Sequence, residues 1–174
     1  MSLLFYPAAA IALFATLMVI TRVHAVHALL YLVVAQLAVA LLFFLLGAPF
    51  AAALEVLVYA GAVMVMFIFV IMMLNLGRPT LLQERGWLPK GIWIGPGLLA
   101  GGLLAELLLV LSAGPALEPH WVPPQRVGAA LFGPYLLAVE LASLLLLAAL
   151  VGAYHLARPY LRRADQDDTV EAER

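Results

Sequence analysis

Long apolar stretches, separated by short polar breaks, cover most of this chain of 174 residues. A helix that spans a membrane needs about 20 mainly apolar residues, since it rises by about 1.5 Å per residue across an apolar layer about 30 Å thick. Five stretches satisfy this requirement. The pattern predicts an all-α integral membrane protein with five transmembrane helices, at about residues 3–21, 28–47, 50–75, 92–111 and 134–157.

The breaks contain residues that end or begin helices. Ala48-Pro49 predicts a tight turn between the second and third spans. Pro134 is suited to the first turn of the fifth span, because proline fits there without losing a helical hydrogen bond. Residues 127–132 predict a short interfacial segment just before it. We expect one transmembrane domain over residues 1–160, followed by a polar cytoplasmic tail over residues 161–174 that cannot build a core.

The composition supports a membrane location and excludes several classes of function. Hydrophobic residues make up 66% of the chain and charged residues 11%, whereas soluble domains are roughly half apolar, so lipid is the expected surrounding. The net charge of −1 gives no reason to expect nucleic-acid binding. The absence of cysteine excludes disulfides, thiolate zinc sites and cysteine-ligated iron–sulfur clusters within this chain.

The basic residues predict the orientation in the membrane. In a five-span arrangement, eight of the nine Lys and Arg residues fall on one side, and only Arg126 falls on the other. Because basic residues concentrate in cytoplasmic loops, the N-terminus is expected outside and the C-terminus in the cytoplasm. The eight residues on the cytoplasmic side are Arg22, Arg78, Arg85, Lys90, Arg158, Arg162, Arg163 and Arg174.

Three carboxylates, Glu55, Glu106 and Glu140, lie inside predicted spans, all in the outer half of the membrane. A charge in a bilayer is costly, so such residues usually face protein or water and often belong to ion or proton paths. A neutral or hydrogen-bonded acid near the headgroups is the simpler interpretation for Glu55 and Glu106. For Glu140, which lies deeper, a role in carrying protons is an equal alternative.

The centre of the third span contains a tyrosine beside a run of small residues. Tyr59 is the one tyrosine well inside a span, so its hydroxyl needs a partner there, either on a neighbouring helix, in water or on another subunit. Glu55 lies four residues earlier, on the same face of an α-helix. Gly61 follows closely and is a point at which a helix can bulge or rewind. The combination favours a helix that can move, although packing alone also explains the glycine.

Two further patterns favour structure over chemistry. Gly97 and Gly101 have the spacing of a GxxxG helix-packing motif. The histidines are predicted at the ends of spans or in loops, with His24 and His27 together in a short cytoplasmic loop, so a facing pair for haem is not expected. With no phosphate-binding loop, no nucleophile–base pair and no cluster of metal ligands, the chain is expected to hold no catalytic residue, cofactor or metal of its own.

Two segments resemble a known family. Residues 54–74, "LEVLVYAGAVMVMFIFVIMML", are similar to the third helix of subunit J of proton-pumping NADH–quinone oxidoreductase, respiratory complex I, whose mitochondrial counterpart is chain 6. Residues 22–33, "RVHAVHALLYLV", resemble the entry to the second helix of that family, although the typical Asn-Pro is absent. The five-span layout agrees over about residues 1–160, whereas the fourth and fifth spans and the tail agree in arrangement only.

The resemblance implies a function that this chain does not perform alone. It implies a non-catalytic subunit in the membrane arm, in the inner membrane of a bacterial cell, that helps couple quinone reduction to proton translocation. FMN, the iron–sulfur clusters and the quinone would be held by partner subunits. The implied neighbours are the quinone-site subunit, the small A-type and K-type subunits and the antiporter-like subunits.

The resemblance also implies specific residues for proton gating. The third helix of the family carries a π-bulge and changes between π-bulged and α-helical forms. This would place Tyr59 and Gly61 at the moving point, and Val65 would face the proton path and dry it in the α form. Glu55 and Glu140, as carboxylates inside the spans, are the predicted acids of such a path.

Two other functions remain open from the sequence. The chain is also compatible with a small subunit of a multisubunit cation/proton antiporter, which would have partners that do not oxidise NADH. It is equally compatible with a structural membrane spacer, in which neighbouring helices merely satisfy Glu55 and Tyr59.

Overall fold

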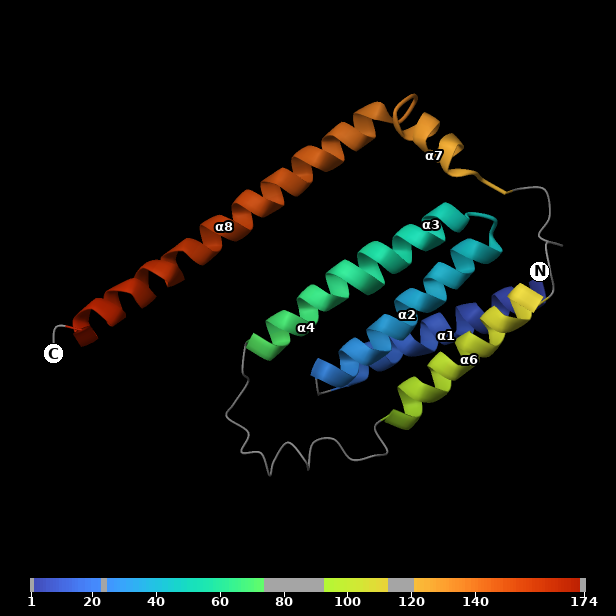
Figure 1. The fold of residues 1–174 in the computed structure, drawn as a ribbon, viewed down its shortest axis with the longest axis horizontal. Helices are drawn as coiled ribbons and strands as arrows, with labels where there is room; N and C mark the ends of the chain where they lie inside the picture. Colours follow the sequence, from blue (N-terminus) through green and yellow to red (C-terminus); the bar gives the residue numbers. More distant parts are fainter. Residues whose placement is uncertain (1, 23–24, 74–92, 113–120, 173–174) are drawn as a thin grey trace. The chain divides into compact units, whose positions relative to one another are not determined.

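The computed structural model describes residues 2–22, 25–73, 93–112 and 121–172, without the side chains of residues 2–3 and 159–172. All regular structure in these ranges is helical (Figure 1). Five helical stretches in them are long and apolar enough to cross a membrane, so the five-span prediction is confirmed. They are Leu4–Thr21, Ala25–Leu45, Pro49–Met73, Ile94–Ser112 and Leu136–Arg158.

The chain divides into two compact units, Met1–Pro123 and Pro124–Arg174. The first unit contains four of the spans. Its helices are α1 (Ser2–Thr21), α2 (Ala25–Leu45), α3 (Pro49–Leu54), the π-helix η1 (Glu55–Val63), α4 (Met64–Met73) and α6 (Ile94–Ser112).

The second unit consists of α7 (Pro124–Leu131) and α8 (Leu136–Ala172). A short helix is therefore present where a short segment was predicted, whereas the fifth span begins two residues later than predicted. Pro134 lies in the turn before α8, in which the Leu136 N–H bonds the Gly133 carbonyl. The backbone of α8 also stays helical to Ala172, because the polar tail contains many residues with high helix propensity.

Helix α2 is the centre of the first unit, since it packs against α1, α6 and the α3–η1–α4 segment. Figure 1 shows α3, η1 and α4 as one continuous rod beside it. The core is made largely of small side chains, which let membrane helices approach closely. Its buried residues are Ala8 and Ala15 of α1, Val34, Ala35, Ala38, Leu41 and Leu45 of α2, and Leu103 and Val110 of α6.

A glycine-ended turn joins α2 to α3. Gly47 has a φ of 82°, a left-handed conformation that glycine adopts without a Cβ penalty. The Gly47 N–H bonds the Phe44 carbonyl and the Ala48 N–H bonds the Phe43 carbonyl, which is the Schellman pattern. Pro49 then starts α3 where its missing N–H costs nothing. The predicted tight turn is confirmed, with Gly47 as its conformational requirement.

The glycines of α6 differ in what surrounds them. A Cβ at Gly95 would collide with the Tyr31 hydroxyl, and a Cβ at Gly102 would rest 3.6 Å from Ile11. At Gly97 and Gly101 it would meet no atom within 4 Å in the described residues. Within this chain, the close approaches are therefore made by Gly95 and Gly102 and not by the predicted GxxxG pair.

We predict that Gly95→Ala destabilises the first unit by about 1–3 kcal/mol, the usual cost of overpacking. Tyr31 cannot move aside freely, because it is buried and its ring lies under Arg22, with the guanidinium carbon 5.4 Å from the ring centroid. The measurement is thermal unfolding of the full chain in mild detergent.

Gly97→Ala is the matched control for that substitution, and it is expected to be neutral or slightly stabilising because its Cβ enters open space. Tyr31→Phe in the Gly95→Ala background should restore part of the lost stability by removing the colliding oxygen. Equal unfolding temperatures for Gly95→Ala and Gly97→Ala would contradict the prediction.

Candidate functional site

The third span changes its winding at the residues that the sequence singled out. Upstream, the Glu55 N–H bonds the Ala51 carbonyl, four residues back, as in an α-helix. At the other end of η1, the Met64 N–H bonds the Tyr59 carbonyl, five residues back. Between them, nine residues form a π-helix, a rare conformation that is frequent at functional sites. The predicted π-winding around Tyr59 and Gly61 is therefore present in this structure.

Gly61 lies inside the π-helix at a crowded position. A Cβ at Gly61 would lie 3.3 Å from the carbonyl oxygen of Val56, five residues earlier. The small neighbours Ala60 and Ala62 add little bulk around it. A larger residue at position 61 would therefore press on the carbonyl that belongs to the widened turn.

Tyr59 and Glu55 are not bonded to each other. Tyr59 is 50% exposed and Glu55 is half-buried, and neither side chain makes a hydrogen bond within the part of the chain that the structure describes. The expected shared face depended on the α-helical repeat of 3.6 residues, which η1 does not follow. Both groups are open to a partner from outside the chain, such as water or another subunit.

The face of the third span that points away from α2 is exposed. No residue of η1 is fully buried, and in α4 only Met64 is buried. Val65, the first residue after it, is 49% exposed. Among the described helices outside the third span, η1 packs mainly on α2.

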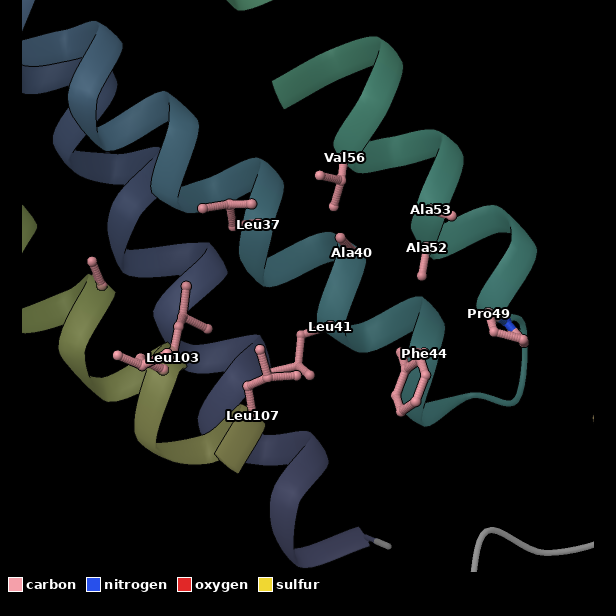
Figure 2. A pocket seen from close by; sticks show the side chains of 12 residues that line it. Leu37, Ala40, Leu41, Phe44, Pro49, Ala52, Ala53, Val56, Leu103 and Leu107 are labelled. Atoms are coloured by element: carbon pink, nitrogen blue, oxygen red, sulfur yellow. The ribbon is translucent and has the colours of Figure 1, made fainter. Parts of the chain in front are cut away.

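An apolar pocket of about 640 Å³ lies beside the start of η1. Figure 2 shows the side chains of Val56 and Ala52 pointing toward α2 in this pocket. Every lining side chain is apolar, so the pocket gives room for side-chain movement without offering a site for a charge. The lining residues are Leu37, Ala40, Leu41, Phe44, Pro49, Ala52, Ala53, Val56, Ala100, Leu103, Leu104 and Leu107.

The remaining acids of the spans occupy different surroundings. Glu140 lies in α8, in the second unit, and its side chain is exposed; its carbonyl accepts a bond of 2.7 Å from Ser143 Oγ. Glu106 lies in α6 and is only 6% exposed. Neither of its oxygens has a hydrogen-bond partner in the described residues, although the side chain lies beside the backbone of Ala8 in α1.

The burial of Glu106 was not predicted from the sequence, although one pattern pointed to it. Leu99, Leu103, Glu106 and Val110 repeat at intervals of three and four residues, which is the stripe that α6 turns into the core. A second correction concerns His27, which is buried in the first turn of α2 and not in a loop. His24 lies outside the described residues.

Comparison with known proteins places this helical arrangement in a family. Residues 15–156 match the family described as NADH-ubiquinone/plastoquinone oxidoreductase chain 6. NADH-quinone oxidoreductase subunit J of Pseudomonas aeruginosa is 58% identical over 161 residues, which cover 91% of this chain and 97% of that protein. Subunit J of Escherichia coli K12 is 50% identical over 160 residues, covering 91% and 87% of the two chains.

A more divergent relative shows the same coverage. Subunit J of Buchnera aphidicola from Schizaphis graminum is 46% identical over 162 residues, which cover 91% of this chain and 98% of that protein. Each match extends over nearly the whole length of both proteins, and the family match includes η1 with Tyr59 and Gly61. The chain belongs to the NADH-ubiquinone/plastoquinone oxidoreductase chain 6 family.

Proposed function

We infer that this chain serves as the J-type membrane-arm subunit of a bacterial NADH–quinone oxidoreductase. The family match and the near full-length similarity to proteins named subunit J support this assignment. We further propose that the subunit helps couple quinone reduction to proton translocation, and that its third span acts as the gate.

The observation that carries the gating proposal is the π-winding of η1. A π-helix and an α-helix use the same backbone donors and acceptors, so the segment exchanges one set of bonds for another without exposing polar groups to lipid. The change from π to α turns the side chains after Gly61 about the helix axis.

In this mechanism the two windings differ in what they present to the proton path. In the π form, Tyr59 and Glu55 are available to order water, since neither is bonded within the chain. In the α form, Val65 takes the position facing the path and dries it. Glu55 and Glu140 are the proposed proton-carrying acids, and redox chemistry belongs to the subunits that hold FMN, iron–sulfur clusters and quinone.

The proposed assembly follows from the exposed surfaces. The helix α8 buries none of its spanning residues within the described chain, and the outer face of η1 and α4 is equally uncovered. We propose that lipid and the quinone-site, A-type, K-type and antiporter-like subunits cover these faces. In the inner membrane the N-terminus would lie outside and the C-terminus in the cytoplasm, as the basic residues predict.

Isolation of the tagged chain from its native membranes in mild detergent tests the assignment. We expect it to bring down a large assembly that oxidises NADH with quinone as acceptor. Recovery in a small assembly without NADH oxidation would refute the assignment and favour a cation/proton antiporter subunit.

We predict that Gly61→Leu lowers proton pumping more than it lowers assembly. Leucine adds a Cβ against the Val56 carbonyl and favours a regular α-helix over glycine by about 1 kcal/mol, which moves the π–α balance roughly fivefold. The measurement is the H⁺/e⁻ ratio of the complex in liposomes. Gly97→Leu, on an open surface of α6 within this chain, is the comparison variant. A normal H⁺/e⁻ ratio with full quinone reductase activity in Gly61→Leu would argue against a moving third span.

We also predict that Tyr59→Phe slows turnover by about two- to tenfold. Loss of one hydroxyl that orders water removes a hydrogen bond worth about 0.5–1.5 kcal/mol. Rates of NADH:quinone turnover are to be measured across pH for this variant and for Tyr6→Phe, whose ring is 70% exposed on α1. Wild-type rates for Tyr59→Phe at every pH would identify its hydroxyl as structural.

A further inference from the structure

The acid on α6 differs from the other two in what can reach it. Glu106 is covered by its own chain, with 6% of its surface exposed, so lipid or a neighbouring subunit cannot supply a partner for it. Glu55 and Glu140 retain exposed surface and can be met from outside. Among the described residues, neither carboxyl oxygen of Glu106 has a hydrogen-bond partner. An ionised carboxylate in such a position is strongly unfavourable.

No described cation lies close enough to offset a charge on Glu106. Its neighbours α1 and α2 place apolar residues at this level, including Ala8, Leu41 and Leu45. On α1 the one titratable side chain of the apolar stretch is Tyr6, which is 70% exposed. On α2 the titratable groups are His27 and Tyr31, and the charged group near them is Arg22 on α1.

Those groups lie toward the opposite end of the bundle. Tyr31 lies against Gly95, which is 11 residues from Glu106 and therefore about 16 Å away along α6. Arg22 lies over the same tyrosine ring. With no counter-charge in reach among the described residues, the neutral acid is the form of Glu106 that this interior accommodates.

Glu106 lies near one end of the bundle. Glu106 is six residues from the end of α6 at Ser112, about 9 Å along the helix. On the facing helix, Pro7 has no N–H, so the Leu3 carbonyl lacks its usual helical donor one turn away. Ala8 carries only a methyl group beside the carboxyl.

We propose that Glu106 is a second proton-binding position of this membrane protein, outside the π-helix. The side chain is a neutral carboxylic acid held between α1, α2 and α6. It exchanges its proton with water at the end of the bundle where α1 begins, and the Leu3 carbonyl and at most a few water molecules connect it to that end. The proposal depends on the packing of α6 and is independent of gating by η1.

Infrared spectroscopy of the full chain in lipid vesicles tests the proposal. The chain is synthesised with ¹³C-labelled glutamate carboxyls, so that its carboxylic-acid C=O band is separated from unlabelled carbonyls. The wild type is expected to show a protonated-acid band at neutral pH that Glu106→Gln lacks. This band should shift when H₂O is replaced by D₂O, because the acid proton exchanges. Glu140→Gln is the matched control and should leave the Glu106 band in place.

Each outcome bears on the proposal. An unchanged carboxylic-acid region in Glu106→Gln, with the same amide band for helix, would show that Glu106 is ionised and would overturn it. A band that disappears in Glu106→Gln but does not shift in D₂O in the wild type would also overturn it, since the proton would be sealed in. If Glu106→Gln does not fold, as judged by loss of its helical amide band, the variant Glu106→Asp is measured in its place. Its shorter acid should move the carboxylic-acid band, and an unmoved band would refute the assignment of that band to Glu106.

Discussion

A bilayer core contains no water to bond backbone N–H and C=O groups, so a span must satisfy them within its own helix. The third span of this chain meets that constraint while departing from α-winding. The segment Glu55–Val63 is wound as a π-helix, whose last turn closes with the Met64 N–H on the Tyr59 carbonyl, five residues back, and the α-helix resumes at Met64. The π-winding therefore keeps the backbone donors and acceptors of the segment within the helix, as the bilayer requires.

The same constraint explains the rest of the first unit. Gly47 ends α2 with two bonds that occupy otherwise free carbonyls, and Pro49 begins α3 without a donor to satisfy. In the packing of the helices, α2 contacts the third span on one side and the α1–α6 pair on the other. The central helix α2 thus packs on both the α-helical and the π-helical parts of the first unit.

The sequence predicted the elements well because its signals were local. Apolar length identified five spans within a few residues, and Ala48-Pro49 identified the tight turn. The motif around Tyr59 and Gly61 identified the π-winding only through resemblance to a family, since a glycine in a helix is equally compatible with packing. Signals that depend on which helix faces which were less reliable. Gly97 and Gly101 matched a packing motif, whereas the structure uses Gly95 and Gly102. The burial of Glu106 was not predicted, because it depends on the side of α6 that meets α1.

One geometric property of η1 reaches beyond the segment itself. Each residue of an α-helix turns the chain by about 100° and advances it by about 1.5 Å, so converting one π-turn to α rotates and advances everything after it by about that amount. Residues from Met64 to Met73 continue the same rod for ten residues, or about 15 Å. Under the proposed change of winding, a change of bonding at Gly61 would turn the far end of the helix through more than a quarter of a revolution.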